Sequence, residues 1–550
     1  MKNWDKKEAL QFLGIVLLTV IGLCLFWGRQ GDVAVDTGRE FYIPEQMLNG
    51  QVLYKDIFNI YGALAYQINM ILYNFFGANT LTLHIAGNIA GLGIIILVYL
   101  IAKQFLDRFY AILIPVFTIF IGIFKMHIFN YTVPYSFAVT YGMLVVLVSL
   151  YCLLKYLKTQ KNNFLYFSAF FAGTAFAFKY DFAPFLLIFP LVCYLQKESF
   201  KTFLKLVLIG LIIPIVSFSS VFACGVNFND FINNIDLFRR IAQAPSLTYF
   251  YQNNGVFLNL TTSISILKNL SIFCLILLLW KFVAKKTFAH KATSYILQTL
   301  LAIILLTLIY KTGFTFIGIA TLCLCLIKYN KIFTDKFNFI CLIALILLSI
   351  KSIFICKLGF YGIYSFPFLL MALTLVLSEY YFKGQKYLKL ILALACIILL
   401  TPPLKSEFTR RGLYKSKIET QKGWISSATN KTASALLVNF ILEKTDKNDK
   451  IVILPEGHMI NFLTNRKSDD YYGNLIPMYV ESLGENNIIN HYKQNKPEYF
   501  VITDRDMTEY GKQYICLDYA SNLCNWIFEN YHVVYKILGA PEYTVLRKNE

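Results

Sequence analysis

Acidic residues are scarce over most of this sequence. Residues 1–403 contain fourteen Asp and Glu against 32 Lys and Arg, and 57% of the whole chain is hydrophobic. So little negative charge on so apolar a chain excludes an ordinary soluble globular protein. The sequence also shows no internal repeat and no low-complexity tract, and so it gives no support to a repeat-built or disordered architecture.

Long apolar runs take the place of the missing charges. A helix of roughly twenty apolar residues crosses a bilayer core. About thirteen such windows can be placed, so the expected fold class is a polytopic α-helical membrane protein. No small-residue cleavage site follows the first run, and no cleavable signal peptide is expected. The predicted spans are residues 10–27, 81–102, 109–124, 132–154, 164–178, 182–196, 206–224, 269–284, 293–310, 313–327, 337–355, 361–382 and 388–403.

The basic residues indicate how these spans are oriented. With the N-terminus inside, 21 of the 32 Lys and Arg fall in seven short inner connections, in accord with the positive-inside rule. Thirteen spans then put the loops at 28–80 and 223–268, and residues 404–550, on the extracytoplasmic side. Residues 404–550 carry 19 Lys and Arg against 18 Asp and Glu, so the net charge of +19 belongs to the spans. It therefore predicts membrane lipids as partners and no nucleic acid.

Residues 404–550, which follow Pro402-Pro403, have the charge content of a water-exposed domain. Alternating strand and helix patterns predict a small α/β domain. This domain has no Gly-rich phosphate loop, Walker motif or nucleophile elbow, so structural or acceptor-contact roles are favoured for His458 and Asp504. Cys516 and Cys524 can pair if the compartment oxidises thiols, and no CxxC or His-rich spacing accompanies them to indicate a metal site. Helices are predicted at 432–445, 481–495 and 520–531, and strands at 450–454, 499–503, 532–538 and 543–546.

Five of the fourteen acidic residues gather in the loop that follows the first span. They lie within one 25-residue window, and the loop, residues 28–80, is longer than a linker needs. Carboxylates gathered beside a membrane edge indicate chemistry or ion handling. Short helices are expected at 40–48, ended by Asn49-Gly50, and at 61–76, ended by Gly77. The five residues are Asp32, Asp36, Glu40, Glu45 and Asp56.

Further candidates are predicted on the same outer face. Lys179 and Asp181 lie between two spans, where mutual neutralisation and a role in a site are both open. Arg239 and Arg240 suit a phosphate, because guanidinium groups bind its oxygens in pairs, but lipid headgroups or surface salt bridges explain them equally well. Tyr361 lies in a short outer turn at 357–364 and is a candidate for substrate binding.

The acidic loop also carries a family-like order of residues. It resembles the membrane-embedded glycosyltransferases of the GT-C fold, in particular bacterial members related to protein mannosyltransferases, aminoarabinose transferases and lipopolysaccharide galacturonic acid transferases. Thr37 stands where Glu is frequent in them, and Ala63 where Pro is common. The motif covers under a tenth of the chain, and the remainder matches in topology. The matching residues are Asp36, Arg39, Gly50, Tyr54, Asp56, Gly62 and Leu64.

The resemblance implies an inverting glycosyltransferase of the bacterial inner membrane. Such an enzyme moves a hexose or pentose from a polyprenyl-phosphate carrier to a glycolipid, glycan or protein acceptor on the outer face. By the resemblance Asp36 is the general base, and Asp56 either orients the acceptor or holds a divalent cation; no other cofactor is implied. Position and charge make Lys179, Arg239 and Arg240 the phosphate candidates, and Arg39 could instead pair with Glu40 or Asp36. The expected substrate-binding set is Arg39, Glu40, Tyr54, Lys179, Asp181, Arg239, Arg240 and Tyr361.

Two other classes of polytopic protein stay open. A lipid or glycan transporter or flippase needs ionisable or helix-breaking residues within its spans and commonly has a repeated half, whereas the charges here cluster outside the spans. An O-antigen ligase or polymerase-like protein usually has its large outer loop late in the chain. Here a large loop follows the first span.

Overall fold

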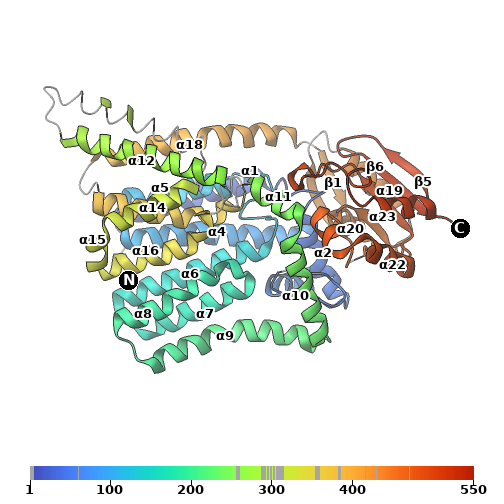
Figure 1. Cartoon of the computed structure of the whole chain (residues 1–550), viewed down its shortest axis with the longest axis horizontal. Coiled ribbons are helices and arrows are strands. Elements are labelled where there is room, and N and C mark those ends of the chain that lie inside the picture. Colours follow the sequence, from blue (N-terminus) through green and yellow to red (C-terminus); the bar gives the residue numbers. More distant parts are fainter. Residues whose placement is uncertain are drawn as a thin grey trace.

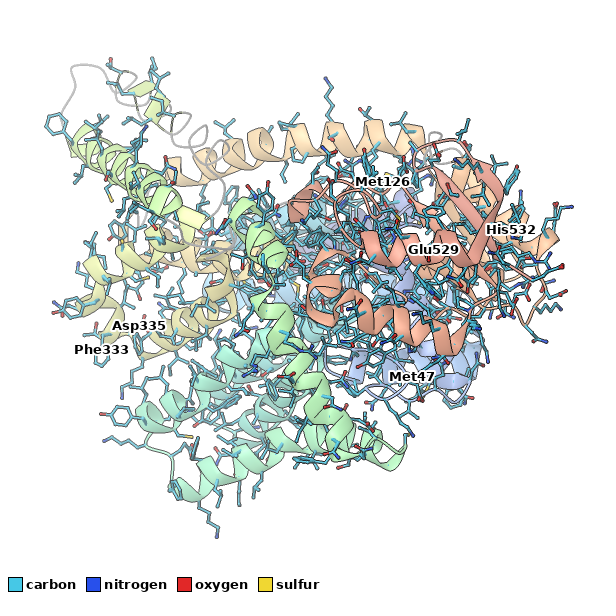
Figure 2. All side chains as sticks on the ribbon, turned by 45° about the vertical axis from the view of Figure 1, so that its right-hand side comes forward. Met47, Met126, Phe333, Asp335, Glu529 and His532 are labelled. Carbon is cyan, nitrogen blue, oxygen red and sulfur yellow. A yellow bond between two sulfur atoms is a disulfide. The ribbon has the colours of Figure 1, made fainter. Side chains whose placement is uncertain are left out.

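The chain folds into a long bundle of helices with a smaller α/β domain at one end (Figure 1). The structure is a computed structural model that describes residues 5–59, 61–254, 260–285, 315–353, 360–381, 386–414, 416–427, 432–469 and 471–550, with a few isolated positions between 293 and 304. Most of the predicted span 293–310 and part of the predicted turn 357–364 lie outside these residues. Figure 2 shows Phe333 and Asp335 at the end of the bundle remote from Glu529 and His532 of the α/β domain.

Within the described residues, the bundle contains predicted spans as helices. Four described helices are long and apolar enough to cross a membrane, judged by length and composition: α1 (Lys6–Phe26), α4 (Thr80–Phe105), α6 (Phe137–Thr159) and α9 (Phe200–Ala223). The chain is therefore a mostly helical integral membrane protein with several spans. The other described bundle helices are α5 (Arg108–Gly122), α7 (Asn162–Phe178), α8 (Ile188–Gln196), α12 (Leu260–Lys285), α14 (Thr315–Ile327), α15 (Tyr329–Thr334), α16 (Lys336–Ser349), α17 (Phe366–Val376) and α18 (Lys386–Leu413).

Two spans differ in detail from the sequence prediction. The window at 182–196 is divided into a 3-10 helix, η1 (Tyr180–Leu187), followed by α8. Pro184 lies inside η1, where its ring and missing N–H are incompatible with a regular α-helix. Helix α18 continues through Pro402 and Pro403 and ends ten residues after the predicted end of the last span.

Short helices connect the bundle to the α/β domain. Helix α2 (Thr37–Leu48) begins three residues before the predicted start at residue 40. Helix α3 (Leu64–Phe76) begins three residues after the predicted start at residue 61. Helix α3 ends at Gly77 as expected, because this residue has φ +85°, which glycine adopts without strain. In Figure 1, α10 (Phe228–Gln243) and α11 (Pro245–Asn254) pass between the bundle and the α/β domain.

The α/β domain is built on a four-stranded sheet in the order β3-β4-β6-β5. Strands β3 (Ile451–Leu454) and β4 (Tyr499–Thr503) are parallel, as a helical crossover connection requires, and β5 (Tyr531–Ile537) and β6 (Tyr543–Lys548) form the predicted antiparallel hairpin. Helices α19 (Thr432–Lys444) and α23 (Ser521–Asn530) confirm the helices predicted at 432–445 and 520–531. Cys516 and Cys524 form a disulfide.

The single helix expected at 481–495 is wrong. The structure has two helices, α21 (Pro477–Leu483) and α22 (Glu485–Asn495), separated by Gly484 with φ +80°. A left-handed residue cannot continue a helix, so the chain turns at this glycine. The sequence prediction also lacked the hairpin of β1 (Ser416–Thr420) and β2 (Gly423–Ser427) and the short helix α20 (His458–Thr464).

Helix α2 packs directly against α20, and this contact joins the two parts of the molecule. A Cβ at Gly38 would lie 2.1 Å from the backbone nitrogen of Met459, so only glycine permits this approach. The Tyr42 ring stacks on His458 at 5.0 Å between centroids, and its hydroxyl accepts a hydrogen bond from the backbone of Ser468. Burial lowers the pKa of His458 to about 4, so this histidine is a neutral packing residue. These contacts fix the N-terminus of α2.

Candidate active site

Asp36 lies directly before α2, where the bundle meets the α/β domain. Its carboxylate makes no capping hydrogen bond to the helix, and its Oδ1 lies 3.5 Å from Nη2 of Arg39. The Asp36 side chain is 32% exposed, whereas that of Glu40, one turn along the helix, is 1% exposed. Of these two neighbouring carboxylates, Asp36 is the one that a substrate can reach.

Glu40 holds three helices together. One carboxylate oxygen accepts a hydrogen bond from the Tyr66 hydroxyl of α3 at 2.8 Å, and the other accepts one from the backbone N–H of Phe137 in α6 at 2.7 Å. Burial raises the pKa of Glu40, and Arg39 and the two hydrogen bonds oppose this shift. Its geometry therefore fits a positioning role better than substrate contact.

Arg39 approaches both carboxylates, as the sequence allowed. Its guanidinium lies 3.5 Å from Asp36, 3.8 Å from Glu40, and 5.5 Å from the centre of the Tyr61 ring. Nε and Nη2 are buried without a hydrogen-bond partner among the described residues. Buried N–H groups are nearly always paired in native proteins, so these two donors are suited to oxygens of a bound ligand.

Lys179 is the buried cation of the site. Its side chain is 4% exposed, and its Nζ donates a hydrogen bond to the Tyr135 hydroxyl at 2.9 Å. The same nitrogen lies 4.6 Å from the centre of the Tyr61 ring and 3.8 Å from the Asp181 carboxylate. Lys179 and Asp181 are therefore paired, at the distance of a weak ion pair.

Lys351, just after α16, is a second cation that the sequence reasoning missed. Its Nζ lies 2.8 Å from the Asp181 carboxylate and 5.5 Å from the centre of the Tyr361 ring. Asp181 is thus shared between Lys179 and Lys351. Two ammonium groups beside Asp181 suit an anionic ligand.

Three tyrosines lie around the Asp36 carboxylate and the lysine pair. Asp36 interacts electrostatically with Tyr61, Tyr135 and Tyr361. Tyr361 packs edge-on against Tyr135, with 5.2 Å between ring centroids. The structure thus brings the predicted residues Asp36, Lys179 and Tyr361 to one place, from three distant parts of the chain.

Tyr54 and Asp56 shape the loop that carries Tyr61. The Tyr54 hydroxyl donates a hydrogen bond to the backbone carbonyl of Tyr61 at 2.5 Å. Asp56 is exposed, and its Oδ2 accepts a hydrogen bond from the backbone N–H of Val52 at 2.9 Å, which closes its own turn. Among the described residues, no contact joins Asp56 to Asp36.

An apolar groove of about 260 Å³ adjoins the same loop. Its walls come from the end of α7, from α9 and from α10, and Tyr61 lies at the edge shared with the lysine site. Gly62 packs against the end of α7, because a Cβ there would lie 2.4 Å from the carbonyl of Ala177. The residues that line the groove include Tyr54, Phe176, Tyr180, Phe218, Phe231 and Phe238.

Arg239 and Arg240 lie on α10, and the structure does not bring them into contact with the Lys179 site within the described residues. Both pair with Asp236, at 3.3 and 3.2 Å. Arg240 also donates a hydrogen bond to the backbone carbonyl of Ser482 in α21 at 2.9 Å. Arg240 therefore links α10 to the α/β domain.

The α/β domain contributes groups that no sequence motif indicated. Glu509, just before Tyr510, interacts electrostatically with Asp36, and burial raises its pKa while Arg505 opposes the shift. Arg505 forms ion pairs with Glu456 and, at 3.4 Å, with Glu509. The sequence held no local signal for these residues. For Lys351 a signal existed, since an ionisable residue inside the predicted span 337–355 is a mark of function.

The described residues contain no group of three His, Cys, Asp or Glu that could hold a metal ion. Asp36 has the Arg39 guanidinium as its neighbour, and Asp56 is engaged in its turn. The resemblance left a divalent cation open at Asp56, and among the described residues no group of three possible ligands includes Asp56; at Asp36 the positive neighbour disfavours a cation as well.

Solved structures of known enzymes share this fold. No protein family and no curated protein sequence matches the chain. The oligosaccharyltransferase of Archaeoglobus fulgidus tethered to an acceptor peptide matches 98% of this chain and 74% of its own, at 11% identity and a TM-score of 0.50. At that identity the match shows the fold alone, and it confirms the expected resemblance to GT-C glycosyltransferases.

Two weaker matches were solved with polyprenyl phosphates. ArnT from Cupriavidus metallidurans bound to undecaprenyl phosphate matches 99% of this chain and 98% of its own, at 12% identity and a TM-score of 0.45. AglB from Archaeoglobus fulgidus, in complex with an inhibitory peptide and a dolichol-phosphate, matches 91% and 70%, at 11% identity and a TM-score of 0.48.

Proposed function

We propose that this chain, which shares the fold of an oligosaccharyltransferase, is a membrane glycosyltransferase that uses a polyprenyl-phosphate-linked sugar. One observation carries the proposal. The accessible carboxylate of Asp36 and the Lys179 ammonium group both interact with Tyr61, Lys179 and Lys351 share one carboxylate, and the Tyr61 loop joins that site to an apolar groove. A base, an anion site and a groove for a lipid are what transfer from such a carrier needs.

The two lysines are proposed to hold the phosphate of the donor. In a sugar linked to a polyprenyl phosphate, the phosphate is a diester with one negative charge, and it leaves as a monoester with up to two. Lys179 and Lys351 interact more strongly with the phosphate as this charge grows, and that difference lowers the barrier. Arg39 supplies two further N–H donors that form no hydrogen bond with the described residues.

The aromatic groove is proposed to receive the first part of the polyprenyl tail. Its lining of Phe and Tyr side chains suits a branched hydrocarbon, and it is formed by helices of the bundle. Tyr61 contacts Lys179 and also lines the groove. A ligand with its phosphate at Lys179 can therefore place its tail in the groove.

Asp36 is proposed as the general base. As the acceptor hydroxyl oxygen forms its bond to the anomeric carbon, its proton passes to the Asp36 carboxylate. The bond from that carbon to the phosphate oxygen breaks on the opposite side, and the polyprenyl phosphate leaves with the bonding electrons. Attack opposite the leaving group inverts the anomeric carbon.

The site is proposed to face the extracytoplasmic side, with the N-terminus in the cytoplasm and a bacterial inner membrane around the bundle. The distribution of Lys and Arg over seven inner connections supports this orientation. Asp36 lies beside the α/β domain, so an acceptor reaches it from that side. A glycolipid, a glycan or a protein can serve as acceptor.

The test replaces Asp36 by Asn in a strain that lacks the chromosomal copy. We expect Asp36→Asn to lower transfer at least roughly a hundredfold, the usual contribution of a general base, with membrane abundance unchanged. Mass spectrometry of surface glycolipids and glycans reports the missing sugar. Asp446→Asn, an exposed position on the α/β domain, is the matched control and should restore the wild-type pattern. Transfer by Asp36→Asn at the wild-type rate would refute the mechanism.

A further inference from the structure

A second, polar groove lies between α10 and α22, outside the Asp36 site. Its volume is about 470 Å³, within the usual range of small-molecule sites. The apolar residues Leu237 and Leu483 form part of its lining, and both belong to the core of the α/β domain. The groove is therefore part of the folded contact between α10 and that domain.

Amide side chains dominate the groove. Asn233 comes from α10, and Asn487, Asn490 and Gln494 come from α22. Three of them, Asn233, Asn490 and Gln494, form no side-chain hydrogen bond within the described residues. An amide both donates and accepts, so these groups match ligand hydroxyls, which also do both.

The charges around the groove are already balanced. Arg240 pairs with Asp236 at 3.2 Å, and His491 is bonded to Asp469. An anionic ligand would have to compete with Asp236 for Arg240. The lining therefore favours a neutral ligand over a phosphate or a carboxylate.

Two tyrosine rings complete the lining. Tyr471 and Tyr472 are partly exposed, with 5.1 Å between their ring centroids. Aromatic rings provide an apolar face with a hydrogen-bonding tip, which suits a ligand that alternates C–H and O–H groups. Rings and amides together match a sugar.

We propose that this groove binds a neutral oligosaccharide, as the remote sugar units of the acceptor. The Phe58 ring packs against two tyrosine rings. Its centroid lies 6.0 Å from that of Tyr471, which lines the groove, and 5.5 Å from that of Tyr479. Tyr479 interacts electrostatically with Asp36, so the side chains of Tyr471, Phe58 and Tyr479 connect the groove to the surroundings of the base. The acceptor role rests on the proposed transferase function, whereas oligosaccharide binding does not.

Direct binding tests the proposal. The purified full-length chain in detergent is titrated with soluble tetrasaccharides of glucose, galactose, mannose and N-acetylglucosamine, and with a phosphorylated mannose tetrasaccharide. We expect binding of at least one neutral probe, and binding about tenfold weaker in Asn490→Ala/Gln494→Ala, which removes two hydrogen-bonding amides. The matched control is Asn486→Ala, an exposed amide of α22 that does not line the groove, and it should bind like the wild type.

The outcomes separate this proposal from the transferase function. Asp36→Asn should bind the probe like the wild type, because Asp36 does not line the groove. Transfer retained by Asp36→Asn would refute the transferase mechanism and leave the groove intact. No binding of any neutral probe, preference for the phosphorylated probe, or full binding by the double variant would each overturn the groove proposal.

Discussion

At the scale of residues, the site is defined by one carboxylate shared between two buried or half-buried ammonium groups. Asp181 lies 3.8 Å from Lys179 and 2.8 Å from Lys351. Lys179 is buried, whereas the Lys351 side chain is 39% exposed, and a further anion would stabilise two cations held beside one carboxylate. We therefore regard the arrangement as a site built around its ligand and not as a structural ion pair alone.

This reasoning predicts the effect of removing either lysine. Lys179→Met and Lys351→Met keep the length of the side chain and remove its charge. We expect each variant to lower transfer roughly 10²–10³-fold, because the phosphate loses a group that stabilises its growing charge. Steady-state kinetics with a polyprenyl-phosphate-linked sugar should also show weaker inhibition by polyprenyl phosphate.

The arginine doublet provides the contrast for the lysine variants. Arg239 is 72% exposed and pairs with Asp236 on its own helix. Arg239→Ala should therefore leave the Michaelis constant for the donor within about twofold, since an exposed ion pair contributes little. If this constant rose strongly in Arg239→Ala and stayed unchanged in the lysine variants, the donor phosphate would have to bind at α10 instead of at the lysines.

The buried carboxyl group of Glu40 should make the stability of the protein depend on pH. Burial raises its pKa above the ordinary value of 4.5, so above that pH the folded state holds a proton that the unfolded state has lost. Stability contributed at Glu40 is therefore fully present below pH 4.5 and falls as the pH rises through the window above it. Gln does not titrate, and Glu40→Gln should lose less stability over this window than the wild type.

Thermal unfolding of both proteins in detergent between pH 4.5 and pH 7 measures this difference. Glu40→Gln also loses one acceptor, because Tyr66 and Phe137 use both oxygens. That loss lowers stability by a constant amount at every pH, on the order of 1–3 kcal/mol for an unsatisfied buried group. The test is the slope of stability against pH, and not the constant difference between the two proteins. Parallel curves for the wild type and Glu40→Gln would contradict the raised pKa of Glu40.

The sequence predicted those site residues whose position in the chain reveals them. Asp36 lies in an acidic cluster after a span, and Lys179 is a charge between two apolar runs. Lys351 stands out only as a charge inside a predicted span, and its partner Asp181 comes from tertiary packing; Glu509 reaches the site through tertiary packing, of which the chain order gives no sign. Conversely, the arginine doublet looks like a phosphate site in sequence, yet its partner is Asp236, three and four residues away on the same helix.

At the scale of elements, the position of Asp36 depends on how closely α2 approaches α20. Gly38 makes this approach possible, because a Cβ would lie 2.1 Å from Met459 backbone nitrogen. Backbone cannot yield as a flexible side chain can. Helix α2 and the short helix α20 must separate if Gly38 carries a side chain.

Gly38→Ala should therefore displace Asp36 and reduce transfer. We expect a loss of stability of about 1–3 kcal/mol, the usual cost of overpacking, and a fall in transfer that exceeds what this loss of folded protein explains. The matched control is Gly412→Ala in α18, where a Cβ meets nothing within 4 Å. Melting curves and transfer rates of the purified variants decide; a fully active Gly38→Ala would show that α2 is not held by this contact.

Element boundaries show where local sequence is a sufficient guide. Strands β3 and β4 and the final hairpin of the α/β domain were predictable, because apolar runs bounded by turns mark them. The break between α21 and α22 was missed because Gly484 is a single residue in a helical pattern, and only its φ of +80° reveals the turn.

At the scale of the whole molecule, the active site is formed by two parts that are separate in the chain. Asp36 and the lysines belong to the bundle side, whereas Glu509 and Arg505 belong to the α/β domain. Helix α10 packs into the core of the α/β domain through Leu237 and Ile241. The α/β domain thus encloses one side of the site, and the proposed oligosaccharide groove lies along the same boundary.

The proposed orientation puts the α/β domain and the inner connections on opposite sides of the membrane. Figure 2 places Glu529 in the α/β domain and Phe333 at the far end of the bundle. In cells with a permeabilised outer membrane and an intact inner membrane, a membrane-impermeant maleimide should label Glu529→Cys. It should label Phe333→Cys only after the inner membrane is disrupted, because Lys328, Lys331 and Lys336 predict a cytoplasmic position for that end.

The unmodified chain is the control for its own cysteines, of which Cys24 and Cys224 are exposed. Labelling is compared with that background, and both variants should retain transfer, because neither position is near Asp36. Labelling of Phe333→Cys in cells with an intact inner membrane, together with protection of Glu529→Cys, would reverse the orientation. The acceptor would then have to be cytoplasmic, and the proposed transfer on the outer face would be wrong.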